Sequence, residues 1–230
     1  MLTQEQLEHI ARTRVEIIRK IQTVPVKGTT VEYFNKKFFV LPTVFWPWED
    51  SRPLLENYIV NQGERVLDVC TGSGHIAVFS AYKGAGRVVA LDHNPAAVEA
   101  AKKNAALHGF SEIIDVRLSD MLSALDAKEK FDVVTGNLPF TDQQANNLAE
   151  SAVYDEQLRA NRLFFTGINA HLNPHGRIYL SQANFGALDA VRDLAENAGF
   201  TMKKIGEKKM NNNDPRVFYA FELKKKKHSI

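Results

Sequence analysis

Residues 65–78, with the sequence RVLDVCTGSGHIAV, constrain the fold of this chain more than any other stretch. They open with apolar pairs, Val66-Leu67 and Val69-Cys70, that are typical of a strand buried on both faces. Thr71-Gly72-Ser73-Gly74 follows at once, and a helical pattern begins behind it. Glycine permits positive φ and lets a ligand approach the backbone, and a helix start offers free N–H groups. Strand, glycine turn and helix together predict a site for a nucleotide-like cofactor.

Strand and helix patterns alternate after this turn. We expect strands at 88–91, 113–118, 131–136, 177–181, 201–208 and 216–223, helices at 95–108, 121–128, 155–172 and 187–198, a polar loop at 141–154 and a turn at 173–176. Such alternation is typical of a parallel sheet covered by helices on both faces. The last two strands have no helix between them and should pair as an antiparallel hairpin. We therefore predict a doubly wound α/β fold with a mostly parallel, seven-stranded, Rossmann-like sheet.

The first 43 residues are expected to form an extension to this domain. Residues 3–22 have the apolar spacing of an amphipathic helix, and Thr3 with Gln6 is typical of a capping box. Such a helix needs another surface to bury its apolar stripe. It could lie across the main domain, cover the site as a lid, or mediate dimerisation with a second chain. Residues 28–45 are expected to form a hairpin with its turn at 35–37, followed by a helix at 52–61. We place the main domain at 44–224 and a basic tail at 225–230.

Composition excludes several classes of protein. Cys70 is the single cysteine, so neither an intrachain disulfide nor a cysteine-rich zinc site can form. No apolar run approaches the roughly 18 residues that span a bilayer, and the polar N-terminus is unlike a signal peptide, so we expect a cytoplasmic protein. The net charge is only +2, although residues 201–230 are strongly basic. We interpret Lys224–Lys227 as a solvated end, with nucleic acid or an acidic partner as the alternative.

Acidic residues at the strand ends decide between cofactors. Gly72–Ala77 fits G-x-G-x-x-A, and Asp92 lies 20 residues after Gly72, which would also suit NAD. However, Asp68, Asp92 and Asp120 lie at three successive strand ends, which line one crevice in a parallel sheet. Three carboxylates are a poor environment for a pyrophosphate. They suit a zwitterionic ligand with a ribose diol, an amino group and a sulfonium.

Residues 65–140 resemble the class I S-adenosylmethionine-dependent methyltransferases. Val66–Gly74 is similar to their first motif, Asp92 to their ribose-binding acid and Asp120 to their adenine-side acid. Asn137-Leu138-Pro139-Phe140 resembles the (N/D)PP(Y/F) motif of the enzymes that methylate planar nitrogens, such as a glutamine amide in release factors or the exocyclic amine of adenine. The stretch at 44–51, VFWPWEDS, resembles the segment that precedes the first motif in HemK/PrmC-type enzymes.

The resemblance implies a site and a mechanism. The cofactor, S-adenosyl-L-methionine, would be bound by Asp68, Thr71, Gly72, Ser73, Gly74, Asp92, His93, Asp120, Met121 and Asn137. The Asn137 side-chain oxygen and the Leu138 carbonyl would accept the two N–H hydrogens of the substrate and direct its lone pair at the methyl carbon. Phe140 would stack on the planar group, and Pro139 would fix the backbone.

Two departures from the family pattern stand out. Leu138 occupies the place of the first proline in the motif. Only 43 residues precede the lead-in, too few for the helical substrate-binding domain of bacterial release-factor enzymes, so we expect a compact form of the family or a relative with another substrate.

Several functions therefore stay open. The substrate is a release-factor-like protein, an RNA or DNA base, or a small molecule held in a pocket walled by Trp46 and Trp48. An NAD-dependent oxidoreductase and a silent cofactor-binding subunit are the alternatives from other classes. A homo-oligomer or an activating subunit is compatible with each. We interpret His75 and Cys70 as packing residues, and Glu49-Asp50 as either ligand contacts or a solvated surface.

Overall fold

The computed structural model describes residues 2–211 and 213–226. Its elements are α1 (Gln4–Gln22), β1 (Thr29–Tyr33), β2 (Lys36–Val40), α2 (Arg52–Asn57), β3 (Arg65–Val69), α3 (His75–Tyr82), β4 (Arg87–Asp92), α4 (Pro95–Leu107), β5 (Ile114–Leu118), β6 (Phe131–Gly136), α5 (Leu148–Ser151), α6 (Arg159–Gly167), β7 (Leu172–Ala183), α7 (Leu188–Asn197), β8 (Phe200–Lys209) and β9 (Val217–Lys225). Short 3₁₀ helices at Glu156–Leu158 and Ile168–His171 flank α6. Within those residues, no helix combines the length and apolar character needed to cross a membrane.

The sheet confirms the predicted architecture. Its seven strands run in the order β5-β4-β3-β6-β7-β9-β8, with parallel pairing from β5 to β7. β9 is antiparallel to both β7 and β8, so the C-terminal hairpin joins the sheet through its second strand. From β3 the chain adds β4 and β5 on one side, and then returns to add β6 on the other side of β3. The ends of β3 and β6 therefore lie side by side. This point, where the strand order reverses, is where ligands bind in open α/β sheets.

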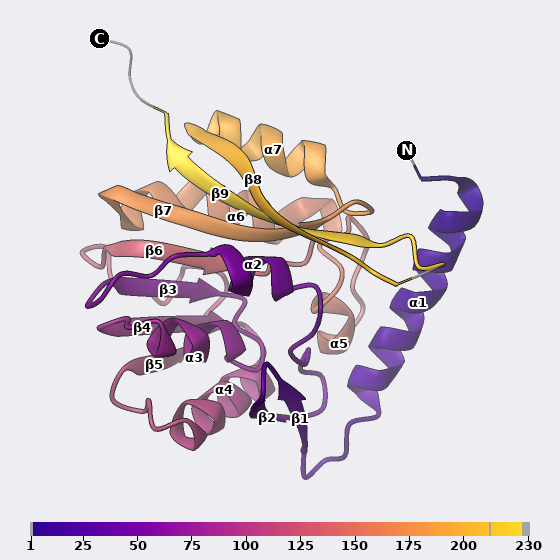
Figure 1. Ribbon diagram of the computed structural model, residues 1–230, viewed down its shortest axis with the longest axis horizontal. Coiled ribbons are helices and arrows are strands. Elements are labelled where there is room, and N and C mark those ends of the chain that lie inside the picture. Colours follow the sequence, from indigo (N-terminus) through magenta and orange to yellow (C-terminus); the bar gives the residue numbers. More distant parts are fainter. Residues whose placement is uncertain (1, 212, 227–230) are drawn as a thin grey trace.

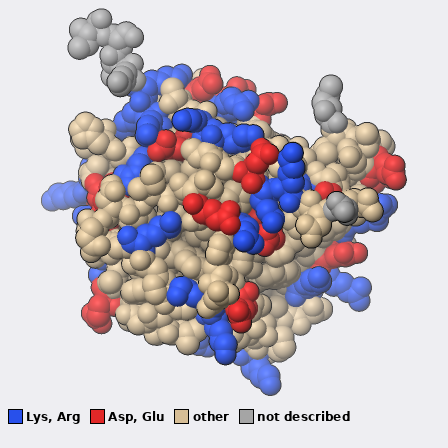
Figure 2. Space-filling view, viewed as in Figure 1, with Lys and Arg blue, Asp and Glu red and all other residues tan. Residues whose placement is uncertain are grey.

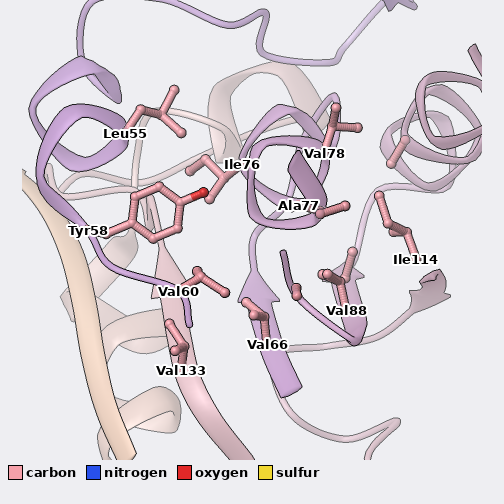
Figure 3. Packing of buried hydrophobic residues seen from close by; sticks show 14 of the residues in the cluster. Leu55, Tyr58, Val60, Val66, Ile76, Ala77, Val78, Val88, Ile114 and Val133 are labelled. Atoms are coloured by element: carbon pink, nitrogen blue, oxygen red, sulfur yellow. The ribbon is translucent and has the colours of Figure 1, made fainter. Parts of the chain in front are cut away.

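Helices cover both faces of the sheet (Figure 1). On one face α2, α3 and α4 pack on the strands through Tyr58, Ile76, Val66 and their neighbours, and Figure 3 shows these side chains meeting between the layers. On the other face, α6 and α7 pack through Phe164, Phe165 and Val191. Burying a large apolar side chain contributes roughly 1.5–3 kcal/mol. These two layers hold the strand ends rigidly in place.

The N-terminal segment packs in two different ways. The β1–β2 hairpin joins the main core, where Phe38 is fully buried together with residues of α2 and α3. Helix α1 instead lies apart from both layers, across the edge where the parallel strands end (Figure 1). Thr3 and Gln6 form the expected capping box. Ile18 and Ile21 pack against Ala149 and Tyr154, so the partner of this helix is the segment around α5.

Some of the expected boundaries are wrong for local reasons. The expected helix at 121–128 is a series of turns, because the Ser119 hydroxyl bonds the Met121 carbonyl and the Ala124 N–H instead. The expected helix at 155–172 is broken, because Gln157 and Leu158 have φ of 52° and 53°.

Three further differences are small. The helix expected at 52–61 ends at Asn57, because Tyr58 is extended and its ring enters the core. The hairpin turn falls one residue earlier than expected, at Phe34 and Asn35, which both have positive φ. The turn expected at 173–176 is part of β7, where the pairing with β6 is irregular.

The lysines of the basic C-terminal part that the structure describes, Lys224–Lys226, are exposed as expected, but they are not a frayed end. Lys224 and Lys225 belong to β9, and the Lys226 N–H donates to the Gly199 carbonyl, so these residues are ordered. Lys227 lies outside the described residues. Glu207 and Glu222 form ion pairs with Lys204, Lys209 and Lys224. Figure 2 accordingly shows acidic residues interspersed among the basic ones on this face.

Candidate active site

A cavity of about 1030 Å³ opens at the ends of β3, β4 and β6. It is large enough for a nucleoside cofactor together with a small planar group. Ten of the residues expected at the site line it: Thr71, Gly72, Asp92, His93, Asp120, Met121, Asn137, Leu138, Pro139 and Phe140. Asp68, Ser73 and Gly74 do not, and they support the cavity wall from behind.

The glycine turn needs its glycines. Gly72 and Gly74 have φ of 55° and 78°, where a side chain would strain the backbone. A Cβ at Gly74 would also lie 2.8 Å from the Ala101 Cβ on α4. Glycine at this position therefore allows α3 and α4 to pack closely behind the turn. The space beside Gly72 is more open, since a Cβ there would meet only the Phe45 carbonyl, at 3.5 Å.

Asp68 stabilises the turn rather than facing a ligand. It is fully buried and accepts hydrogen bonds from the hydroxyls of Thr71, at 2.5 Å, and Thr135, at 2.7 Å. Burial raises the pKa of Asp68 to about 6. We expect direct cofactor binding by this carboxylate from the sequence; in the structure it does not line the cavity, because hydroxyls of the glycine turn and of β6 occupy its two oxygens.

Asp92 is the acid that the cavity presents. Its two oxygens accept the N–H groups of Gly72, at 2.8 Å, and of Asn94, at 2.9 Å. Burial raises the pKa of Asp92, and these N–H groups oppose the rise. A carboxylate has about four acceptor positions, so Asp92 can still accept two hydroxyls. The residues at this strand end therefore fit a ribose diol.

The remaining cofactor candidates differ in their bonding. Asp120 at the end of β5 is exposed and forms a bidentate ion pair with Arg159, with contacts of 3.0 and 2.6 Å. Hydrogen bonding from Arg159 lowers the pKa of Asp120. His93 bonds the Ser151 hydroxyl of α5 at 3.1 Å. Met121 has φ of 50° and is buried against the cavity wall.

Asn137 is fixed by a residue far away in the sequence. Its Nδ2 donates to Oδ2 of the buried Asp50 at 2.6 Å. An ionised carboxylate only accepts hydrogen bonds, so the contact orients the amide. The Asn137 Oδ1 is buried, and no residue in the described part of the chain gives it a hydrogen bond. Burial raises the pKa of Asp50 to about 6, although the Asn137 amide opposes this.

The rest of the Asn137–Phe140 motif is held by its backbone and by packing. Leu138 is buried against the sheet, where a Cβ at Gly136 would lie 2.4 Å from its Cδ1. The Pro139 carbonyl accepts from Asn161 at 3.0 Å, and Asp155 in turn accepts from Asn161. Phe140 meets the Phe185 ring edge-on, with centroids 5.7 Å apart. Leucine thus replaces the first proline without loosening the loop.

His75 is a buried residue that also contributes to the cavity wall. Its ring nitrogens bond the hydroxyls of Ser51 and Ser73 at 3.0 and 3.2 Å. Burial lowers the pKa of His75 to about 3, so the ring is neutral. Its contact with Ser51 ties the segment that carries Asp50 to the glycine turn.

Several lining residues were not among the candidates. Arg14, Tyr154 and Arg216 contribute to the cavity from α1, the segment after α5, and the start of β9. No spacing in the sequence connects these residues. The aromatic wall consists of Phe45, Trp48, Phe140, Phe185 and Phe218; Trp46 instead stacks on Phe45. Cys70, expected in the core, also lines the cavity.

Comparisons with known proteins agree with this geometry. The family model described as "Methyltransferase domain" matches residues 60–228. A release factor glutamine methyltransferase of Cereibacter sphaeroides is 32% identical over 214 residues, which cover 86% of this chain and 75% of that protein. A putative protein N5-glutamine methyltransferase of Methanocaldococcus jannaschii is 36% identical over 110 residues, which cover 48% of this chain and 54% of the relative.

A solved structure shares the fold. The 16S rRNA N2 G1207 methyltransferase of T. thermophilus, in complex with AdoMet and guanosine, superposes with a TM-score of 0.62 at 21% identity, covering 86% of this chain and 50% of that one. Together with the family match and the sequence relatives, the cavity and its turn lead to one conclusion: the chain belongs to the class I S-adenosylmethionine-dependent methyltransferases, among the HemK/PrmC-like enzymes.

Proposed function

We propose that this enzyme transfers a methyl group from S-adenosyl-L-methionine to a planar nitrogen, either a protein glutamine amide or an exocyclic amine of a nucleobase. The observation that carries the proposal is the unpartnered Oδ1 of Asn137 at the end of β6. A buried acceptor without a donor costs roughly 1–3 kcal/mol. A substrate N–H would satisfy it.

The cavity fits the proposed methyl donor. The cofactor residues would be Asp92 for the ribose, the backbone at Thr71 and Gly72 for the part beside the turn, and Asp120 with Met121 for the adenine. Arg159 donates to both carboxylate oxygens of Asp120. When the adenine amine binds, at least one of these oxygens would have to accept from the amine as well as, or instead of, Arg159. His93 lies beside this end of the cavity. When bound, the donor supplies a methyl group on a positively charged sulfur.

The protein's part in the reaction is orientation and charge stabilisation. An amide or arylamine nitrogen is a weak nucleophile because its lone pair is delocalised. Asn137 Oδ1 would accept one N–H and the Leu138 carbonyl the other, which turns the lone pair toward the methyl group. Asp50 acts through Asn137, since it holds the amide nitrogen and leaves the oxygen facing the substrate. Phe140 would pack on the planar group and stabilise the growing positive charge.

The relatives named as glutamine methyltransferases favour a protein glutamine as the substrate. One feature favours the second candidate, a small molecule. Helix α1 and the segment 141–154 lie over the cavity and contribute Arg14, Ile17, Ala145 and Leu148 to its walls. A covered aromatic cavity suits a small planar acceptor, whereas a glutamine in a protein loop needs a gap between α1 and this segment. We place either reaction in the cytoplasm.

Asn137→Ala tests the proposal. We expect methyl transfer to fall about 100-fold, since one positioned hydrogen bond at a reacting group contributes on that order. The affinity for S-adenosylhomocysteine, measured by titration calorimetry, should change less than about threefold. Labelled S-adenosylmethionine with a cell extract, followed by protease or nuclease digestion, identifies the type of acceptor.

The exposed Asn197→Ala on α7 serves as the matched control, and its activity should equal that of the wild type. Near-normal methyl transfer by Asn137→Ala would remove Asn137 from the mechanism. Failure of the wild type to bind S-adenosylhomocysteine would overturn the proposed function as a whole.

A further inference from the structure

Arg14 is a cation without an anion in the wall of the cavity. It projects from α1, and its Nε is buried without a hydrogen-bond partner among the residues that the structure describes. Within residues 2–211 and 213–226, it forms no ion pair with a carboxylate. Its charged head lies 5.8 Å from the ring centroid of Tyr154, which is another cavity residue.

The other arginines of the cavity are bonded within the protein. Arg159 pairs with Asp120, and Arg216 pairs with Asp214 at 2.6 Å. Arg162 donates from Nε to the Gln157 carbonyl at 2.9 Å. These three contacts use protein oxygens to satisfy the guanidinium groups. Arg14 faces the same space, and for its Nε the described residues supply no such oxygen.

A half-buried guanidinium without an anion is unfavourable. Burial lowers the pKa of Arg14, and the electrostatic influence on it comes from Tyr154 rather than from an acid. An aromatic ring recovers only part of the lost solvation, because a cation–π contact is weaker than a charge-assisted hydrogen bond. The planar five-donor guanidinium is matched by a carboxylate or a phosphate.

The support around Arg14 holds it in place. One turn further along α1, Ile18 and then Ile21 are buried against Ala149 and Tyr154, so the helix is anchored beside the cavity. The residues matched by the methyltransferase family model begin at 60. The cation is therefore supplied by the N-terminal helix and not by the matched domain.

We propose that Arg14 binds a carboxylate or phosphate of a ligand in this cavity. The inference rests on the proposed function for the identity of the ligands. The anion has two possible sources: the amino-acid carboxylate of the methyl donor, or an acidic group on the methyl acceptor. In either case, α1 completes the binding site when the ligand arrives.

The first arm of the test uses the donor product and its truncated form. S-Adenosylhomocysteine carries the amino-acid carboxylate, and 5′-methylthioadenosine lacks it. If the donor supplies the anion, Arg14→Met should weaken S-adenosylhomocysteine about 10- to 100-fold, the range for a hydrogen bond to a charged group. The affinity for 5′-methylthioadenosine should stay unchanged, and Arg14→Lys should restore part of the lost affinity.

The second arm uses inorganic phosphate as the anion, first with the protein saturated with S-adenosylhomocysteine and then with the free protein. If the acceptor supplies the anion, phosphate should bind the saturated wild type at least about tenfold more tightly than Arg14→Met. The exposed Arg12→Met on the same helix is the matched control for charge. Circular dichroism of each variant checks that α1 remains folded.

The outcomes separate the two proposals. Equal S-adenosylhomocysteine and phosphate affinities in the wild type and Arg14→Met would overturn the role of Arg14. A loss in Arg12→Met equal to that in Arg14→Met would also overturn it, because the effect would then be one of general charge. If the wild type fails to bind S-adenosylhomocysteine, the proposed function is wrong, and the phosphate titration of the free protein still decides whether Arg14 binds an anion.

Discussion

A single hydrogen bond, from Asn137 to Asp50, orients the amide on which the proposed mechanism depends. The two residues are separated by 87 positions and meet at 2.6 Å in a buried environment. With Asp50 ionised, the Asn137 oxygen is an available acceptor. A protonated Asp50 can donate to that oxygen, and the amide then turns its N–H groups to the substrate. The protonation state of one carboxyl thus controls whether the site accepts or donates.

Methyl transfer should therefore depend on pH. Since burial raises the pKa of Asp50 to about 6, we expect activity to fall as the pH drops below about 6. In Asp50→Asn this acid limb should disappear, and activity at pH 8 should be lower by about tenfold, the effect of replacing a charge-assisted hydrogen bond with a neutral one. Rates between pH 5 and 9 at saturating substrate test both expectations. An unchanged acid limb in Asp50→Asn would assign it to another group.

Unfolding experiments provide the control for the same variant. The folded-state pKa of Asp50 is raised above the ordinary value of about 3.9, so the folded protein binds the proton more tightly than the unfolded chain. Keeping Asp50 ionised in the folded protein therefore lowers the free energy of unfolding above pH 6. This loss shrinks as the pH falls through the folded pKa toward the unfolded value, because Asp50 then becomes protonated. Asp50→Asn should increase the free energy of unfolding at pH 8 relative to wild type, and the increase should shrink toward pH 4. A variant that loses activity but gains stability is not merely misfolded.

At the scale of elements, Asn104 on α4 joins three parts of the chain. Its Nδ2 donates to the carbonyls of Phe39 on β2 and Ser73 in the glycine turn, both at 2.8 Å, and its Oδ1 accepts the Phe39 N–H at 2.7 Å. The side chain is fully buried. The N-terminal hairpin and the cofactor turn are therefore positioned by the same residue.

Asn104→Leu should destabilise the protein strongly. A leucine of similar size would leave the buried Ser73 carbonyl and the part-buried N–H and carbonyl of Phe39 without this partner. A buried group without a partner costs about 1–3 kcal/mol, and a part-buried group costs less because water reaches it. We expect the free energy of unfolding to fall by about 2–4 kcal/mol in urea denaturation. The exposed Lys102→Ala on the same helix should change it by no more than about 0.5 kcal/mol. A loss below about 1 kcal/mol in Asn104→Leu would mean that water replaces these bonds.

Across the whole molecule, the cavity is assembled from segments that are far apart in sequence: α1, the glycine turn, the Asn137–Phe140 motif, the segment 141–154 and the start of β9. The sheet and its two helix layers enclose the two large buried apolar clusters. Helix α1 packs outside them through a small apolar cluster with the segment around α5. Because few buried contacts hold these two segments, they are where ligand binding can reduce motion.

Ligand binding should therefore stabilise the protein and slow local opening. At 100 times its dissociation constant, S-adenosylhomocysteine should add about 2.7 kcal/mol to the free energy of unfolding. Hydrogen exchange should slow in residues 4–22 and 141–154 in particular. NAD at the same concentration should do neither, because Asp92 and Asp120 disfavour a pyrophosphate. Stabilisation by NAD instead would contradict the choice of cofactor.

The sequence by itself determined the order of the elements and the cofactor side of the site. Largely apolar runs such as Val66–Val69 are local patterns that predict buried strands. An acid at the end of a parallel strand, such as Asp92, lies at the edge of the sheet where all the parallel strands end. The motif at 137–140 directly follows a strand in the same way, and its four residues line the same cavity. Each of these features depends only on residues that are close together in the chain. Periodicity and short motifs were therefore sufficient to predict them.

Only the tertiary structure decided which side chains meet. Asp68 looked like a ligand-facing acid, but the hydroxyls of Thr71 and Thr135 enclose it. The sequence offered Asp50 as a ligand contact or a solvated residue but did not indicate Asn137 as its partner, and Arg14 carried no local signal. Both placements come from contacts between segments that the sheet order and the docking of α1 bring together. A hydrogen bond or an unpaired charge depends on distances in space, and no spacing along the chain encodes the 2.6 Å between Asp50 and Asn137.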